Sequence, residues 1–394
     1  MIGATGSIGR SAADVAATQP DRLRLVALAA RARWQDACAL AQRFGVEALA
    51  LEDEGAASAA AERLAGSGVA VLRGAAGVAE IARWPSADVT LAAATGIAGL
   101  PPVLAALRAG KDVALANKES LVAAGRLVSE TARLCGARLL PVDGEHCGVF
   151  QCLHGRPPGS DLARLWLTAS GGPFRAWDAE RIARATPDEA LRHPVWPMGR
   201  RITVDSASLM NKGFEVIEAA WLFGLPPGDI RVVVHPQGIV HALIQFVDGA
   251  FLAQCSHPDM RLPIAYALGF PDRWPQSRVP TLDPTALGRL DFEPPDERRF
   301  PCLRLAYDAA ERGRLCPAAL NGADEVAVER FLRGEIAFGD VPSVLEDALA
   351  RHDEGDDGSL DAVLAADGAA RARARAWARR VSLAPRAGRT AEGG

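Results

Sequence analysis

Short apolar runs alternate with longer helix-like segments up to residue 142, and this alternation constrains the fold more than any other feature. Strands separated by helices of roughly ten or more residues form βαβ units, so a parallel sheet with right-handed crossovers is expected. The first part of the chain is therefore predicted to be α/β, a doubly wound (Rossmann-like) nucleotide-binding domain. The expected strands are 23–29, 46–51, 69–72, 89–93, 113–116 and 137–142.

Glycines recur at every third position near the start, in Gly3-Ala4-Thr5-Gly6-Ser7-Ile8-Gly9. Such spacing lets a backbone approach a diphosphate at a helix amino terminus, where free N–H groups favour anions. Only Met1 and Ile2 precede this loop, and two residues are too few for the central strand that normally delivers it. We expect unpaired strand edges and a gap in the core there, and hypothesise that the natural product carries roughly five to ten more residues.

Lysine and asparagine are rare in this chain, yet they occur together twice. The three lysines are Lys111, Lys118 and Lys212, and the two dipeptides are Asn117-Lys118 and Asn211-Lys212. Arginine fills nearly every other cationic position, although an ammonium and a guanidinium are not interchangeable in a tight pocket. The two dipeptides therefore indicate functional sites.

The second dipeptide lies in an apolar segment that reads as one helix capped by Ser206. Along that helix Ser208, Asn211, Lys212 and Glu215 would share one face. A helix otherwise so apolar is largely buried, so its polar stripe needs partners. The alternative is an ordinary Lys212–Glu215 pair on a solvated face.

Two carboxylates, Asp143 and Glu145, follow the last predicted strand of the first domain. They would lie at the carboxyl end of that strand, where open α/β sheets present ligands. With Glu215 as a third carboxylate they form an oxygen-rich site suited to Mg²⁺ or Mn²⁺. Alone, the Asp-x-Glu pattern is more often a solvated turn.

Composition narrows the function classes. The net charge is −4 and no basic face suggests nucleic acid. No apolar run reaches the ~18 residues of a membrane span, and no signal peptide is visible. The seven cysteines are scattered and odd in number, which fits reduced thiols in a cytoplasmic protein.

The pattern changes after Asp143. Strands are expected at 165–168, 230–234, 239–247 and 251–254, with a turn at Asp248-Gly249, which indicates an α+β domain with an antiparallel part. Residues 270–301 are rich in Pro and Asp and read as a connector. Helical periodicity follows at 303–311, 323–332, 341–351 and 360–381, and an Arg-Ala tail is expected to be a solvated helix end.

Several motifs, in order along nearly the whole chain, resemble the 1-deoxy-D-xylulose 5-phosphate reductoisomerase family. They are Gly3 to Gly9, Ala116-Asn117-Lys118-Glu119-Ser120, Asp143-Gly144-Glu145-His146, Ser170-Gly171-Gly172-Pro173-Phe174, His193-Pro194-Val195-Trp196-Pro197-Met198-Gly199, Asp205 to Glu215, His235-Pro236-Gln237 and Pro258-Asp259-Met260-Arg261.

The resemblance implies an enzyme that uses NADPH and a divalent cation (Mg²⁺, Mn²⁺ or Co²⁺) to convert 1-deoxy-D-xylulose 5-phosphate to 2-C-methyl-D-erythritol 4-phosphate. It also implies a homodimer. Asp143, Glu145 and Glu215 match the metal ligands, and Lys118 matches a lysine beside the metal and substrate oxygens. The substrate contacts that match are Lys118, Glu145, Ser170, His193, Ser206, Asn211, Lys212 and Glu215.

The remaining matches concern the closing loop and the cofactor. His193, Trp196 and Met198 match a loop that closes over substrate. The NADPH contacts that match are Thr5, Gly6, Ser7, Ile8, Asn117, Glu119 and Gly199, to which we add Arg31 and Arg33, whose position after the second strand suits the 2′-phosphate of NADPH.

The expected domains are an NADPH-binding domain (1–142), a catalytic domain with the closing loop (143–270), a connector (271–301), a helical domain (302–384) and a disordered tail (385–394). The chain departs from the family pattern at three places, Gly144, Arg31-Ala32-Arg33 and Gly238. Two other functions stay open at this point: a homoserine-dehydrogenase-like NADP-linked oxidoreductase, and a non-catalytic NADP-binding regulatory protein.

Overall fold

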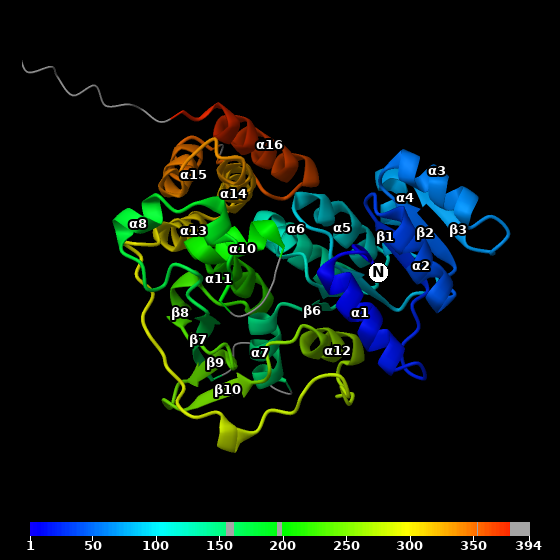
Figure 1. Cartoon of the computed structure of the whole chain (residues 1–394), viewed down its shortest axis with the longest axis horizontal. Helices are drawn as coiled ribbons and strands as arrows, with labels where there is room; N and C mark the ends of the chain where they lie inside the picture. The colour runs from blue at the N-terminus through cyan, green and yellow to red at the C-terminus, as the bar shows by residue number, and fades with distance from the viewer. Residues whose placement is uncertain (155–160, 195–198, 353, 379–394) are drawn as a thin grey trace, which may run out of the picture.

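The structure, a computed structural model, describes residues 1–154, 161–194, 199–352 and 354–378. The amino-terminal sheet and its helices lie at one end of the molecule, and a second sheet lies at the other end (Figure 1). The carboxyl-terminal helices cover one side of the part that contains the second sheet (Figure 1). The expected α/β architecture, with parallel strands first and a helical last part, is confirmed.

The amino-terminal sheet is wholly parallel and consists of two three-stranded ladders. One has the order β1-β2-β3 and the other the order β4-β5-β6. Every predicted strand is present; β3 and β5 are shifted by one residue, and the other four are shorter than the apolar runs that predicted them. The strands are β1 (Ala27–Ala30), β2 (Ala48–Leu51), β3 (Ala70–Arg73), β4 (Val89–Ala92), β5 (Asp112–Leu115) and β6 (Leu139–Pro141).

Met1 and Ile2 occupy the place between the two ladders. Ile2 forms parallel bridges with Ala29 of β1 and Ala92 of β4, and its side chain is buried. The Met1 amino group donates to the Ala27 carbonyl oxygen at 2.7 Å. The expectation that two residues would leave the neighbouring edges unpaired is therefore wrong at this level of the sheet, because backbone pairing needs only one residue to bridge both neighbours.

Helices connect these strands and cover the sheet, as the doubly wound pattern requires. Most begin within a few residues of the end of a strand; α1 instead follows the Met1–Ile2 segment, and α5 follows a 3₁₀ turn (Ile97–Gly99) after β4. The helices are α1 (Ser7–Thr18), α2 (Trp34–Phe44), α3 (Glu54–Arg63), α4 (Gly74–Ala82), α5 (Leu100–Arg108) and α6 (Lys118–Cys135).

The second sheet has the order β10-β9-β7-β8 and mixed directions. β7 runs parallel to β8 and antiparallel to β9, and β9 and β10 form a hairpin. The antiparallel part that the sequence predicts is thus present, and its first strand is longer than expected. The strands are β7 (Leu162–Ala169), β8 (Ile230–Val234), β9 (Val240–Phe246) and β10 (Phe251–Cys255).

Four short or medium helices accompany this sheet, namely α7 (Gly144–Leu153), α8 (Ala179–Ala183), α9 (Pro187–Ala190) and α12 (Arg261–Gly269). Residues 271–300 contain one short 3₁₀ turn (Pro284–Ala286) and run along the outside of the second sheet (Figure 1).

The segment expected to be one helix capped by Ser206 is two helices, α10 (Arg200–Ser208) and α11 (Met210–Phe223). Leu209 separates them in the left-handed conformation, with φ 60°. Ser206 therefore lies inside α10 rather than at a cap. Ser208 lies on a different helix from Asn211, Lys212 and Glu215. The prediction of burial is confirmed, because Lys212 and Glu215 are almost fully enclosed.

The carboxyl-terminal helices are α13 (Pro301–Arg312), α14 (Cys316–Leu332), α15 (Val341–Leu349) and α16 (Leu360–Ala376). α14 packs against α16, and it also contacts α6 of the amino-terminal region. The helix predicted over 360–381 ends at Ala376, and Arg371 within it is ion-paired rather than solvated. No helix among the described residues is long and apolar enough to cross a membrane.

Candidate active site

A cavity of about 1660 Å³ lies between the amino-terminal sheet, the α10–α11 pair and the second sheet. Nearly all predicted site residues within the described part line it. Toward the expected cofactor side these are Thr5, Gly6, Ser7, Ile8, Arg31, Arg33, Glu119 and Gly199. Toward the expected substrate side they are Lys118, Asp143, Glu145, Ser170, His193, Ser206, Asn211, Lys212 and Glu215.

The glycine loop brings the start of α1 to the cavity. Gly3 has φ +79°, and a Cβ there would lie 2.4 Å from the Ala93 carbonyl oxygen. A Cβ at Gly9 would lie 2.3 Å from the Ala4 carbonyl oxygen. Side chains at either position would push the loop away from the sheet or from its own helix. Thr5, Gly6, Ser7 and Ile8 at the start of α1 line the cavity, and the free N–H groups of a helix amino terminus favour anions.

Arg31 and Arg33 follow β1 directly and are exposed at the rim of the same end of the cavity. The Arg33 guanidinium donates to the Thr5 carbonyl oxygen, which ties it to the glycine loop. It also lies 3.9 Å from the Asp36 carboxylate.

Asp143, Glu145 and Glu215 form a compact carboxylate cluster at the other end of the cavity. Each offers one oxygen, and these three atoms lie within 4.8 Å of one another. Asp143 caps α7 by accepting from the Glu145 N–H at 3.3 Å, so the turn after β6 points two carboxylates at α11. Three converging oxygens are the donor set of a hard divalent cation.

Lys118 and Lys212 lie on either side of this cluster. The Lys118 ammonium lies 3.0 Å from Asp143 and 3.1 Å from Glu215. The Lys212 ammonium lies 2.9 Å from Glu145 and also contacts Glu215. Because the two lysine side chains are only 10% and 4% exposed, these are buried charge pairs. The solvated Lys212–Glu215 pair weighed from the sequence is therefore wrong.

The environment shifts the pKa values of Asp143 and Glu145 in opposite directions. Burial acts to raise the pKa of Asp143, but Lys118, His146 and Lys212 outweigh it and hold that pKa well below its usual range. Burial and the neighbouring Glu215 raise the pKa of Glu145 to about 8. A carboxyl group with such a pKa is poorly compensated by the protein alone, and a divalent cation at this point would stabilise its ionised form.

His146 and Glu218 form a second layer behind the carboxylates, which the sequence reasoning only partly identified. The His146 Nε2 atom lies 2.9 Å from the Glu215 carbonyl oxygen, and its Nδ1 lies 3.1 Å from Glu218. Asp143, His146 and Glu218 also bring one ligand atom each within 4.8 Å of one another. Glu218 lies three residues after Glu215 in an apolar run, and that spacing was the available signal.

Ser170 and His193 meet across the cavity wall. The Ser170 hydroxyl lies 3.1 Å from the His193 Nε2 atom and also accepts from the Gly172 N–H at 3.2 Å. Trp196 and Met198, predicted for the closing loop with His193, lie outside the described residues.

Asn117 is the one predicted cofactor residue that is not in the cavity wall. Its side-chain amide donates to the Ala94 and Gly96 carbonyl oxygens and to Glu119, and its oxygen accepts from Ser120. The side chain is thus engaged with the protein behind the cavity wall.

At Gly144 the departure from the family pattern leaves room, because an added Cβ would meet only His241 Nδ1 at 3.6 Å.

Comparison with known proteins assigns similarity across nearly the whole chain. Residues 1–125 match the family model described as 1-deoxy-D-xylulose 5-phosphate reductoisomerase. Residues 139–223 match the model for the C-terminal domain of that enzyme, and residues 255–373 match the model described as DXP reductoisomerase C-terminal domain.

Individual proteins agree with these models. The 1-deoxy-D-xylulose 5-phosphate reductoisomerase of Pelotomaculum thermopropionicum is 49% identical over 97% of both chains. That of Pseudomonas putida is 49% identical over 96% of this chain and 97% of its own.

Two solved structures are also similar over 95% of this chain. A DOX-P reductoisomerase in complex with NADPH, fosmidomycin and magnesium superposes with a TM-score of 0.91 at 40% identity, covering 96% of that chain. The Zymomonas mobilis enzyme in complex with NADPH superposes with a TM-score of 0.89 at 42% identity, covering 97% of that chain.

Proposed function

This chain belongs to the 1-deoxy-D-xylulose 5-phosphate reductoisomerase family, and from that premise we propose which of its residues bind the metal, the substrate and NADPH. It is an enzyme that uses NADPH and a divalent metal ion to isomerise and reduce 1-deoxy-D-xylulose 5-phosphate to 2-C-methyl-D-erythritol 4-phosphate, on the route to isoprenoid precursors. Family membership replaces both alternative functions weighed from the sequence.

The observation that carries the proposal is the carboxylate cluster of Asp143, Glu145 and Glu215 in the same cavity as the glycine loop. These three residues would hold Mg²⁺ or Mn²⁺. When bound, such an ion supplies Lewis-acid polarisation of adjacent ketone and hydroxyl oxygens.

Lys118 has the position of the group that stabilises negative charge on the reacting substrate oxygens. Its ammonium lies between Asp143 and Glu215. Burial acts to lower its pKa, but the facing carboxylates raise it well above the usual value, which favours the charged ammonium. A fixed cation in a buried site interacts more strongly with developing charge than it would in water.

Ser170, Ser206, Asn211 and Lys212 would bind the substrate phosphate and hydroxyl groups, with His193 beside Ser170. A phosphate held away from the reacting carbons provides binding energy that orients the substrate. His193, with Trp196 and Met198, would exclude water from the reaction.

NADPH would lie along the other end of the cavity. The start of α1, with Thr5, Gly6, Ser7 and Ile8, would bind its diphosphate. Arg31 and Arg33 would bind its 2′-phosphate. Glu119 and Gly199 would line the path toward the substrate. Asn117 would act indirectly, by fixing the 94–96 turn through its hydrogen bonds.

We also propose a division of the chain into an NADPH-binding domain (1–142), a catalytic domain (143–270), a connector (271–301), a helical domain (302–384) and a tail (385–394). A homodimer is proposed as well. Its support is the outer strand β10, whose Phe251 and Leu252 are 49% and 45% exposed, since a bare apolar edge strand favours pairing with another chain. Seven unpaired cysteines support a cytoplasmic location.

The experiment is NADPH oxidation on addition of 1-deoxy-D-xylulose 5-phosphate with Mn²⁺ or Mg²⁺, with and without a chelator. We expect oxidation that the chelator stops and added metal restores. No substrate-dependent oxidation with either metal would contradict the function, and oxidation unaffected by the chelator would contradict the metal site.

A further inference from the structure

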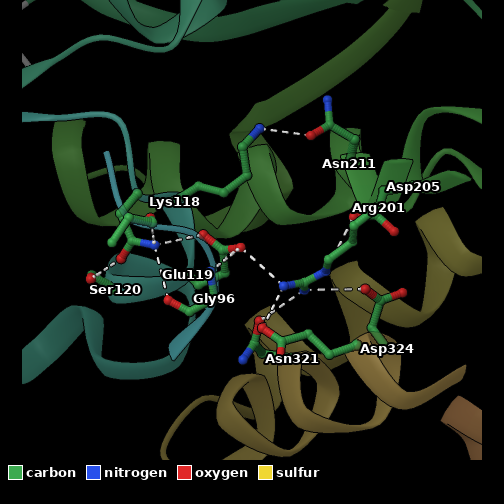
Figure 2. Close-up of polar contacts among 12 residues, drawn as sticks. Gly96, Lys118, Glu119, Ser120, Arg201, Asp205, Asn211, Asn321 and Asp324 are labelled. Carbon is green, nitrogen blue, oxygen red and sulfur yellow. Dashed lines mark hydrogen bonds and ion pairs between the residues drawn. The ribbon is translucent and has the colours of Figure 1, made fainter. Parts of the chain in front are cut away.

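Arg201 lies where three parts of the chain meet, although no motif in the sequence singled it out. It belongs to the first turn of α10, and its guanidinium points between the start of α6 and helix α14 (Figure 2). Its side chain is 23% exposed, and the buried end is surrounded by oxygen atoms.

The contacts of Arg201 come from both neighbouring regions. On the amino-terminal side, it donates to Glu119 at 3.0 Å. On the carboxyl-terminal side, it donates to Glu325, to Asn321 at 3.3 Å and to Asp324 at 3.4 Å. Asp205, one turn along α10, lies 3.7 Å from its Nε atom. One side chain therefore joins α6, α10 and α14.

Glu119 is held on its other sides as well. The Gly96 N–H donates to it at 3.0 Å and the Asn117 amide at 2.8 Å. Gly96 itself packs against α14, since a Cβ there would lie 2.7 Å from the Glu325 carboxylate. The turn that carries Gly96, the start of α6 and α14 are thus packed around one guanidinium.

Carboxylates outnumber guanidinium groups in this cluster even with Arg201 present. Arg371 of α16 also binds Glu325 and pairs with Asp367, so the cluster contains two guanidinium groups. Five carboxylates surround them, namely Glu119, Asp205, Asp324, Glu325 and Asp367.

Two of these carboxylates, Asp205 and Asp324, are buried acids with raised pKa values. The Oδ1 atoms of Asp205 and Asp324 are both buried and without a hydrogen-bond partner in the described part of the chain. Burial together with the neighbouring charge raises the pKa of Asp324 to about 6 and that of Asp205 well above its usual range. Loss of Arg201 would leave Asp205 and Asp324 facing Glu119 and Glu325 without the guanidinium that lies between α10 and α6.

The same cluster lies next to the residues assigned to catalysis. Lys118 precedes Glu119 at the start of α6, and its ammonium donates to Asn211 of α11 at 2.7 Å (Figure 2). α10 leads through Leu209 directly into α11. The Glu119–Arg201 bond therefore fixes the start of α6 relative to the helices that carry Ser206, Asn211 and Glu215.

We propose that Arg201 is a positioning residue, which sets the distance between Lys118 and the substrate-binding residues of α10 and α11 through its bond to Glu119. This inference rests on the proposed roles of Lys118 and Asn211. Arg201 does not contact Asp143, Glu145 or Glu215, so its effect on turnover comes through Glu119, Lys118 and the residues of α10 and α11. Displacement of a reacting group by about 1 Å can lower the rate roughly 100-fold.

The test separates positioning from stability. Arg201→Met removes the link but leaves unbalanced carboxylates, so it is expected to lower the melting temperature and kcat/KM for the phosphosugar together. In the double variant Arg201→Met/Asp324→Asn one buried acid is also removed. We expect the melting temperature to recover while kcat/KM stays at least roughly 30-fold below that of the unmodified enzyme. Arg201→Lys, which keeps the charge but not the fork, should recover part of the activity.

Arg371→Met is the matched control. Arg371 is comparably buried and belongs to the same cluster, but it bridges only α14 and α16. We expect a lower melting temperature and kcat/KM within about threefold of the unmodified enzyme. If the double variant recovers activity along with its melting temperature, Arg201 is structural and the inference is wrong. Failure of the unmodified enzyme to turn over would instead contradict the proposed function.

Discussion

The Lys118 ammonium donates to the Asn211 amide oxygen at 2.7 Å, and this hydrogen bond joins the two Asn-Lys dipeptides of the chain. The residues are 93 positions apart in sequence. Asn211 in turn donates to Glu215 at 2.7 Å, while Lys212 contacts the same carboxylate from the next position of α11. Lys118, Asn211 and Lys212 thus surround one carboxylate.

Replacement of Lys118 by Met should lower kcat without weakening metal binding. The variant keeps the length of the side chain but removes the cation that would stabilise charge on the substrate, so we expect a loss of roughly 100-fold or more, or about 3 kcal/mol in the barrier. A cation beside a metal site opposes a second cation, so Mn²⁺ should bind at least as tightly. Calorimetric titration and steady-state kinetics measure both quantities, and a weaker Mn²⁺ affinity would mean that Lys118 organises the ligands instead.

Lys212→Arg should chiefly raise the KM for the phosphosugar, by roughly tenfold, which corresponds to about 1.4 kcal/mol. The charge is kept, but a planar guanidinium is a poor fit between Glu145 and Glu215, where the Lys212 side chain is only 4% exposed. The measurement is the dependence of the initial rate on substrate concentration at saturating NADPH. An unchanged KM would remove Lys212 from the substrate-binding residues.

Replacement of both Arg31 and Arg33 by Gln should narrow the preference for NADPH over NADH. Both arginines lie at the rim of the cavity beside the glycine loop, where their guanidinium groups would contact a bound 2′-phosphate. We expect the ratio of kcat/KM for the two cofactors to fall roughly tenfold or more. Arg43→Gln is the control, because Arg43 is exposed on α2, the helix that follows Arg33, and does not line the cavity. A constant ratio would place the selectivity elsewhere.

Asp324→Asn should change how stability depends on pH. The pKa of Asp324 is about 6 in the folded protein against an ordinary value of 3.8, because of burial. As the pH rises from about 4 to about 6, the unfolded chain releases this proton first, so the native protein loses stability over that window. The variant lacks this loss and should gain roughly 2–3 kcal/mol relative to the unmodified enzyme between pH 4 and pH 7. Urea denaturation at pH 4 and pH 7 measures the free energy of unfolding of both proteins. If this free energy changes with pH by the same amount in the variant and the unmodified enzyme, the raised pKa of Asp324 is contradicted.

Periodicity in the sequence predicted the parallel sheet because each strand and helix there is a local pattern. The carboxylates after β6 and the polar face of α11 were predictable for the same reason. The break at Leu209 was not, because an apolar residue with positive φ has no local signal. In the structure Ser208 bridges it, accepting from the Met210 N–H at 3.3 Å.

Features made by distant contacts also escaped the sequence reasoning. The Arg201 cluster depends on partners 82 and 124 positions away. The engagement of Asn117 with the 94–96 turn depends on a segment more than one helix earlier in the chain. Pairing of Ile2 with β1 and β4 likewise follows from the assembled sheet rather than from the two residues themselves.

The most direct test of the central claim is Glu215→Gln, studied by NADPH oxidation with 1-deoxy-D-xylulose 5-phosphate and by Mn²⁺ and NADPH titration. Glu215 is 1% exposed and is the carboxylate that both lysines contact, so the change removes one charge with little change in shape. The account predicts that turnover is lost and Mn²⁺ binding weakened while NADPH affinity is nearly unchanged. Retention of more than roughly a tenth of the activity, a change in barrier under ~1.4 kcal/mol, with unaltered Mn²⁺ affinity would contradict it.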